Sequence, residues 1–290
     1  MRKIKDYYKA YWFKEHTSSI NLIAHKLFIK SAGLAYNLKN KSKLKNTKAL
    51  KEKTFHENSN KKVFVFANGP SLADIDLLKI ANLQKDNFDL IAINSFVSKS
   101  AHLAKPDYVV FADKIHFGLK ETTNTQYKTD LNWCIENNVT IFTPAQYSQI
   151  IKYENNYAFN AFVNQYSENT TNITKPLGFY PLTALYAISI AKFLGYREIY
   201  IAGFDNSYFK NFSIKNNNEI TLRHPHYYDK TPSETEVDRH WSPTSELFFD
   251  FYRHFFYIEK ASINSNNIFN ISKETYINTI PRRFDLDVYK

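Results

Sequence analysis

Residues 63–71 read VFVFANGPS, a short apolar run that stops at a turn of Asn, Gly, Pro and Ser. Further apolar runs recur along the chain, and a polar or helical stretch separates each run from the next. Runs that are apolar on both faces and alternate with helices are typical of a mostly parallel sheet with both faces covered. The predicted strands are Val63–Ala67, Phe88–Asn94, Asp107–Asp113, Val139–Thr143, Glu198–Asp205 and Asn267–Ile271.

Helical patterns lie between these strands and complete an α/β order. The predicted helices are Leu72–Leu83, Thr129–Asn137, Leu182–Leu194 and Ser242–Ser262. Ser71 is expected to cap the first of them. We therefore predict a Rossmann-type, mostly parallel sheet with helices on both faces in residues 61–290. Residues 206–241 show little regular pattern, and a segment of that length is typical of a lid over a binding site.

The chain has 290 residues and a net charge of +10, and that charge is unevenly placed. Residues 1–60 contain 14 Lys and Arg against 4 acidic residues, which leaves 24 of each sign in residues 61–290. Because an enzyme of nucleic acids usually carries its positive field around its groove, the neutral body argues against a nucleic-acid partner. The single cysteine, Cys134, excludes an internal disulfide and favours a reducing compartment.

The N-terminal region is basic and amphipathic. Its apolar residues at helical spacing are Ile20, Ile23, Ala24, Leu27 and Phe28. We predict that residues 1–38 form a helical extension on an anionic membrane surface; packing on the body, or on a second copy in a homo-oligomer, is the alternative. Residues 39–60, polar and rich in lysine, are predicted to be a flexible linker. Because no apolar stretch of about 18 residues and no secretion signal is seen, we expect a cytoplasmic protein peripherally associated with the inner membrane.

Polar residues follow several of the predicted strands, where ligands bind in open parallel sheets. They include the turn Asn68–Ser71, then Asn94, Asp113 and the turn Gly203–Asp205. The first turn matches neither a dinucleotide fingerprint nor a P-loop. Its glycine allows a close approach of the backbone, and amides at the start of a helix bind phosphate. The alternative is an ordinary turn with Pro70 at the first helical position.

Two longer motifs resemble a known family. Phe66–Asp76 reads FANGPSLADID, and Leu194–Asp205 reads LGYREIYIAGFD, with Asn94 after the second strand. They are similar to the GNGPSL turn, the asparagine and the LGY-x-EIY-x-SG-x-D strand of bacterial sialyltransferases in glycosyltransferase family 42. The chain also resembles a broader set of surface-polysaccharide proteins that are distantly similar to pterin-pyrophosphokinase-like proteins. That likeness rests on Asp205–Ser207 and on His226–Asp229, which reads HYYD.

The resemblance implies a GT-A-like domain that transfers an acidic sugar, sialic acid or a related one, from a CMP-linked donor. The transfer inverts the anomeric centre, needs neither metal nor other cofactor, and extends a bacterial lipopolysaccharide, lipooligosaccharide or capsule, with a free or lipid-linked glycan as acceptor. The implied nucleotide site consists of Asn68, Gly69, Pro70, Ser71, Asn94, Asp113, Thr183, Gly203 and Asp205. The tyrosines implied at the departing phosphate are Tyr208 and either Tyr227 or Tyr228.

A histidine suits the removal of a proton from the acceptor hydroxyl, because its pKa near 6.5 leaves it mostly neutral in the cytosol. By its place before the long helix, His240 is the family's implied base, and His226 is the second candidate, as base or as phosphate donor. Each could instead be a surface or helix-capping residue. With His224 they do not match common zinc spacings, and the two DxD stretches, Asp74–Asp76 and Asp285–Asp287, are not expected to hold metal.

Two departures concern the donor sugar. The family's Arg-x-x-Ser-Gly stretch is replaced within Gly178–Ala184, and Asp113 stands where an asparagine is expected. Three functions therefore stay open. The first is a membrane-associated glycosyltransferase that uses a CMP-linked acidic sugar. The second is a pterin pyrophosphokinase-like enzyme that uses ATP and Mg²⁺, and the third is a non-catalytic, membrane-anchored nucleotide-binding subunit.

Overall fold

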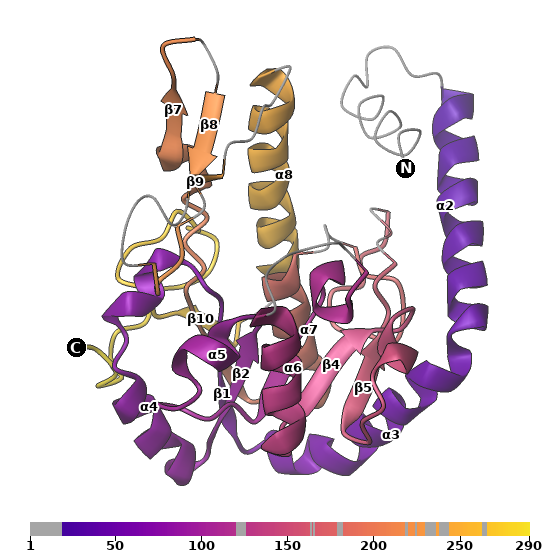
Figure 1. Ribbon diagram of the computed structural model, residues 1–290. Coiled ribbons are helices and arrows are strands. Elements are labelled where there is room, and N and C mark those ends of the chain that lie inside the picture. The colour runs from indigo at the N-terminus through magenta and orange to yellow at the C-terminus, as the bar shows by residue number, and fades with distance from the viewer. Residues whose placement is uncertain are drawn as a thin grey trace.

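A parallel sheet forms the centre of the molecule in the computed structural model (Figure 1). The structure describes residues 19–119, 126–162, 164, 166–178, 182–217, 220–223, 225–229, 236–237, 244–262 and 266–290. Seven strands lie in the order β10-β6-β1-β2-β3-β4-β5, and every neighbouring pair is parallel. The strands are β1 Lys62–Phe66, β2 Phe88–Ile93, β3 Tyr108–Val110, β4 Thr140–Pro144, β5 Asn156–Phe159, β6 Glu198–Ala202 and β10 Ile268–Asn270.

The predicted fold class is confirmed, because each apolar run contains a strand of this sheet. Successive side chains of β1 enter opposite layers of the core: Val63 and Val65 face one layer, and Phe64 and Phe66 face the other. All four are fully buried, which explains why the run is apolar at every position. The sequence analysis missed β5, an edge strand that reads NYAF and has no continuous apolar run.

Helices cover both faces of the sheet (Figure 1). They are α2 Ser19–Lys39, α3 Lys41–Asn58, α4 Leu77–Leu83, α5 Phe96–Ser100, α6 Gln126–Glu136, α7 Thr183–Leu194 and α8 Thr244–Ser262. The face of β1 that carries Val63 packs against α7 and the end of α8, and the face that carries Phe64 packs against α4 and α5. The predicted lid region also contains a small antiparallel sheet of β7 Phe212–Ile214, β8 Ile220–Arg223 and β9 Glu236–Val237.

The predicted helix Leu72–Leu83 is interrupted. A 3₁₀ turn covers Pro70–Asp74, and α4 begins only at Leu77. Between them Ile75 is extended and forms a β-bridge with Tyr289 near the C-terminus. The cap of α4 is therefore Asp76, whose carboxylate accepts hydrogen bonds from the first-turn amides, and the predicted capping role of Ser71 is wrong.

The predicted flexible linker over residues 39–60 is also wrong, because α3 occupies residues 41–58. One side of α3 is anchored to the body: Leu44 and Thr47 are buried, and the Thr47 hydroxyl donates to the Ala158 carbonyl at 2.6 Å. Near its end, the Asn58 amide donates to the Leu194 carbonyl at 3.2 Å. Lysine is a good helix former, so a lysine-rich helix is stable once one side finds such partners.

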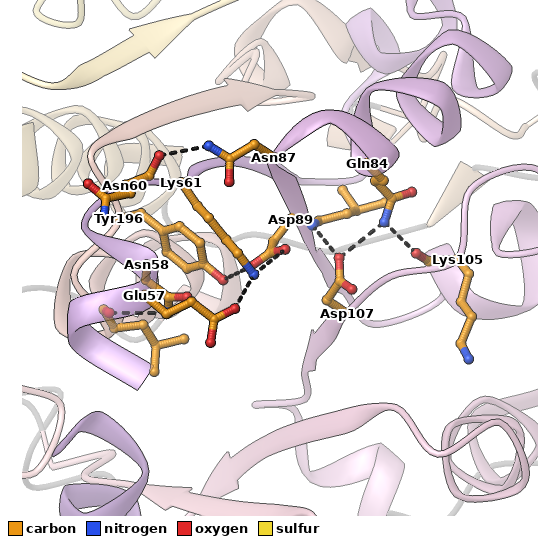
Figure 2. A network of polar contacts seen from close by, with 12 residues as sticks. Glu57, Asn58, Asn60, Lys61, Gln84, Asn87, Asp89, Lys105, Asp107 and Tyr196 are labelled. Atoms are coloured by element: carbon orange, nitrogen blue, oxygen red, sulfur yellow. Dashed lines mark hydrogen bonds and ion pairs between the residues drawn. The ribbon is translucent and has the colours of Figure 1, made fainter. Parts of the chain in front are cut away.

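Side chains at the amino ends of the strands form a connected polar network (Figure 2). Lys61 lies 2.7 Å from Glu57 and 3.7 Å from Asp89, and the Tyr196 hydroxyl donates to Asp89. Nearby, the Asp107 carboxylate accepts from the Leu90 amide at 2.8 Å and from the Gln84 side chain at 3.1 Å. We call Glu57, Lys61, Gln84, Asp89, Asp107 and Tyr196 the amino-edge network. It joins the end of α3 to the sheet.

The predicted N-terminal extension is described from Ser19 onward, as α2; the aromatic and lysine residues before it lie outside the described residues. In the part of the chain that the structure describes, no helix is both long enough and apolar enough to cross a membrane.

Candidate functional site

Two glycine turns meet at the carboxyl edge of the sheet. Gly69 follows β1 and Gly203 follows β6, and the amide of Gly69 donates to the carbonyl of Gly203 at 3.0 Å. Gly203 has a φ of +73°, and a Cβ atom on it would lie 2.3 Å from the carbonyl oxygen of Ala67. A Cβ on Gly69 would lie 2.3 Å from the Asp205 carboxylate. Only glycine fits at both positions, because the two turns are in direct contact.

An open cleft of about 240 Å³ lies beside these turns. Its walls come from the turns after β1, β2 and β6, from the start of α7 and from the segment 204–208. The predicted site residues on its lining are Asn68, Gly69, Pro70, Asn94, Thr183, Gly203, Asp205, Tyr208 and His226. The apolar residues on its lining include Ile93, Leu182, Phe204, Ile258 and Ile277. The cleft therefore combines apolar walls with converging polar groups, as binding sites for small molecules do.

Four buried polar atoms on this lining have no hydrogen-bond partner among the residues that the structure describes. They are Oδ1 of Asn68, Asn94 and Asp205, and Nδ2 of Asn206. A buried polar atom without a partner costs about 1–3 kcal/mol. The backbones of Asn94 and Asn206 are also left-handed, with φ of +47° and +50°. Strain and unpartnered groups gathered in one cleft are typical of a ligand site, where the ligand supplies the partners.

The Asp205 carboxylate is the acidic group of this cleft. It is 7% exposed, and burial raises its pKa above the ordinary value. The Ser71 amide, which donates to its Oδ2 at 3.0 Å, acts in the opposite direction, while the carboxylates of Asp74 and Glu274 raise the pKa further. Its other oxygen accepts no hydrogen bond from the described part of the chain. This geometry suits a neutral hydroxyl donor, such as a sugar hydroxyl, better than a phosphate.

The start of α7 supplies the opposite kind of group. Leu182, Thr183 and Ala184 line the cleft, and the residue before the helix provides no side-chain cap. The first amides of a helix carry a partial positive charge and bind anions. No lysine or arginine is found among the described residues that line the cleft. Negative charge would therefore be held here by backbone amides, hydroxyls and amide side chains.

Comparisons with known proteins place the chain in a family. A family model described as 6-hydroxymethylpterin diphosphokinase MptE-like matches residues 32–211. The chain belongs to this MptE-like family. The matched region contains both glycine turns and the start of α7, and it ends before His226.

No curated protein sequence gives a significant match to this MptE-like chain. Among solved structures, the MAf glycosyltransferase from Magnetospirillum magneticum AMB-1 is similar, with a TM-score of 0.47 and 15% sequence identity. The similarity covers 79% of this chain and 34% of that one, so the MptE-like chain spans about a third of the length of that glycosyltransferase.

Several predicted site residues of the MptE-like chain lie off the cleft lining. Ser71 is buried beside it, and its hydroxyl donates to the Ser272 hydroxyl at 2.9 Å. Asp113 is exposed and accepts from the Ile115 amide at 3.3 Å, as the cap of a 3₁₀ turn. Both side chains therefore make structural hydrogen bonds within the protein.

The tyrosines predicted at the departing phosphate also lie at different depths. Tyr208 lines the cleft, whereas the Tyr227 hydroxyl shares a hydrogen bond of 2.7 Å with Ser100, and burial raises its pKa to about 12. The Tyr227 amide donates to the Asn68 carbonyl at 3.2 Å, so this residue supports the first glycine turn from behind. Tyr228 is not on the lining, and its ring lies 5.1 Å from that of His226.

Of the predicted histidines, His226 lines the cleft, and its own amide is bound by Asp229 at 2.6 Å. His224 and His240 lie outside the described residues. In the DxD stretches, Asp76 caps α4, Asp285 binds Arg283, and Asp287 lies 2.7 Å from Lys79. The described residues contain no group of three His, Cys, Asp or Glu side chains that could hold a metal.

Sequence reasoning missed Asn206 as a site residue, although Asp205–Ser207 was noted as a motif. Its signal was available, because asparagine tolerates the left-handed backbone that a sharp turn after a strand requires. The apolar lining residues Ile258 and Ile277 carried no such signal. They come from α8 and from the C-terminal segment, and only the tertiary fold brings them to the cleft.

Proposed function

We propose that this MptE-like protein transfers an acidic sugar from a CMP-linked donor to a hydroxyl of a bacterial surface glycan, with inversion and without a metal. The observation that carries the proposal is the contact between the two glycine turns. They belong to the two motifs that resemble family 42 sialyltransferases, and they enclose buried, unpartnered atoms of Asn68 and Asp205. A nucleoside offers hydroxyl and amino groups that match such atoms.

The charges in the cleft suggest how CMP would lie. The Asp205 carboxylate repels phosphate and accepts from hydroxyls, so we place the ribose at Asp205. The phosphate would then reach the start of α7, where Thr183, the first amides and the Tyr208 hydroxyl line the cleft and could donate hydrogen bonds to it. A single phosphate leaves with less charge than a diphosphate, and neutral donors of this kind can stabilise it.

The reaction would need a base beside the sugar. The acceptor oxygen attacks the anomeric carbon, the bond from that carbon to the phosphate oxygen breaks, and CMP departs with the bonding electrons. His226 lines the cleft and is our candidate to take the hydroxyl proton; His240 remains the candidate from the sequence. Transfer should fall by about 10²–10⁴-fold in the alanine variant of the true base, with unchanged CMP affinity. If neither His226→Ala nor His240→Ala lowers transfer, both assignments are wrong.

A thermal-shift panel with CMP, CDP, UDP, GDP and ATP tests the nucleotide. A ligand well above its dissociation constant raises the midpoint, and CMP should raise it most. Asp205→Asn should weaken CMP binding at least tenfold. Asp107→Asn is the matched control, because that carboxylate belongs to the amino-edge network, at the opposite edge of the sheet, and should leave CMP binding unchanged. A preference for a diphosphate nucleotide or ATP would overturn the CMP assignment.

The family match favours a second candidate, a diphosphokinase-like reaction. An alcohol oxygen, as on a hydroxymethylpterin, would attack the β-phosphorus of ATP, and AMP would leave with the bonding electrons while Mg²⁺ balanced the charge. Dependence on metal separates the two candidates: pyrophosphoryl transfer from ATP should stop in EDTA, whereas sugar transfer from the CMP-linked donor should continue. Binding of CMP without turnover of any tested donor would favour the third function, a non-catalytic nucleotide-binding subunit.

A further inference from the structure

One side of α2 packs against the body, through the segment that follows β5. His25 Nδ1 and the Tyr166 hydroxyl lie 2.5 Å apart, and Asn160 donates to Asn37 at 2.5 Å. Between these contacts, Gly33 is buried beside the ring of Phe162. The position and rotation of α2 are therefore set by the body, and its opposite side must face outward.

The outward side of α2 is apolar. Its large side chains are each between 57% and 65% exposed, and they are Ile23, Leu27, Phe28, Leu34 and Leu38. At about 100° of rotation per residue, they share one arc of the helix with the exposed Ala24 and Ala35. We call this arc the outer face of α2. Figure 1 shows α2 at the edge of the molecule, rising beside the strands β4 and β5.

Lysines border the outer face on both sides. In the helical rotation Lys30 lies next to Ile23 at one margin, and Lys39 lies next to Phe28 at the other; both are exposed. Lys26 lies beyond Lys30 and is exposed as well. The sequence of α2, SINLIAHKLFIKSAGLAYNLK, contains no acidic residue. Apolar side chains between marginal lysines are the pattern of helices that lie in the headgroup layer of a membrane.

We propose that the outer face of α2 lies on an anionic lipid surface. The charges decide between this occupant and a second copy of the chain. If two outer faces packed together, the marginal lysines would come close to one another, and α2 has no acidic residue to offset them. Anionic headgroups supply that charge, while the apolar side chains enter the acyl boundary. No described helix is able to cross the membrane, so α2 rests along the surface.

Vesicle sedimentation of the full-length chain tests this surface. The protein should sediment with vesicles that mix phosphatidylcholine and phosphatidylglycerol, and much less with phosphatidylcholine alone. Leu27→Ser with Leu34→Ser should lower the binding at least tenfold. The matched control is Leu78→Ser with Ile150→Ser, which removes two comparably exposed apolar side chains elsewhere and should bind as the unchanged protein does. Lys30→Gln and Lys39→Gln should each lower binding about fivefold, an effect that high salt should mask.

Three outcomes would overturn the proposal. Equal binding to neutral and anionic vesicles would contradict the role of the lysines, and full binding by the Leu27→Ser, Leu34→Ser variant would contradict the role of the outer face. If that variant instead changes the sedimentation coefficient in the absence of lipid, the face is an interface between copies. Circular dichroism and the CMP thermal shift of each variant report on folding and on the cleft separately, so this proposal can fail while the proposed function stands.

Discussion

The polar side chains at the two edges of the central sheet differ in whether they have hydrogen-bond partners within the chain. At the amino edge, Asp89, Asp107 and Tyr196 are held by named partners within the chain (Figure 2). At the carboxyl edge, Asn68 and Asp205 are buried, and each keeps an oxygen atom that has no hydrogen-bond partner among the described residues. Because unpartnered buried atoms cost stability, they persist where another molecule can complete them. The amino edge thus holds the structure together, whereas the carboxyl edge has the unpartnered atoms that we propose a ligand completes.

The largest effect should come from breaking the contact between the glycine turns. Gly203 has a left-handed backbone, and Gly203→Ala adds a Cβ that clashes with the carbonyl of Ala67. We therefore expect the free energy of unfolding to fall by about 3 kcal/mol. Gly118→Ala is the control, since Gly118 has a φ of +66° but open space around it, and it should cost about 1 kcal/mol. Urea denaturation measures both. If the two variants lose the same free energy of unfolding, the contact between the glycine turns does not contribute to stability.

Substitutions at the amino edge of the sheet should lower the stability of the protein without changing its affinity for CMP. Asp89→Ala removes the acceptor of the Tyr196 hydroxyl and one partner of Lys61, so we expect a loss of about 2 kcal/mol. The affinity for CMP, measured by titration of the folded variant, should be unchanged. Asp86→Ala, at an exposed carboxylate close by in sequence, should stay within about 0.5 kcal/mol. A weaker CMP affinity in Asp89→Ala would mean that the two edges are coupled.

The smallest effect concerns the charge of Asp205. Burial raises the pKa of this carboxyl group, so the folded chain binds the carboxyl proton more tightly than the unfolded chain does. The folded protein therefore loses stability as the pH rises above the ordinary carboxyl pKa and Asp205 ionises. Asp205→Asn should therefore be slightly more stable than the unchanged protein at pH 7, with the difference shrinking as the pH falls toward 4. Urea denaturation at several pH values measures it. If Asp205→Asn is less stable than the unchanged protein at pH 7, the buried charge of Asp205 does not destabilise the fold.

Elements with a local signal could be predicted from the sequence. Apolar runs such as Val63–Ala67 are strands because both of their faces are covered, and that requirement is visible in the residues themselves. Elements whose stabilising partner lies far away in the chain could not be predicted in this way. The lysine-rich segment that forms α3 became a helix through contacts such as Thr47 with Ala158, and the edge strand β5 carries too few apolar residues to be recognised.

For the candidate site, too, part could be predicted from the sequence and part depends on the tertiary structure. The sequence by itself placed polar residues after β1, β2, β3 and β6, at one edge of a parallel sheet. The strand order β6-β1-β2 brings Asn68, Asn94 and Asp205 to one cleft, whereas Asp113 lies off its lining. Only the tertiary structure decided which of these groups stay unpartnered and that Ser71 is tied to Ser272. Periodicity in the sequence shows which faces of a helix or strand are buried. A hydrogen-bond partner many residues away depends instead on how the helices pack against the sheet, which the sequence pattern does not show.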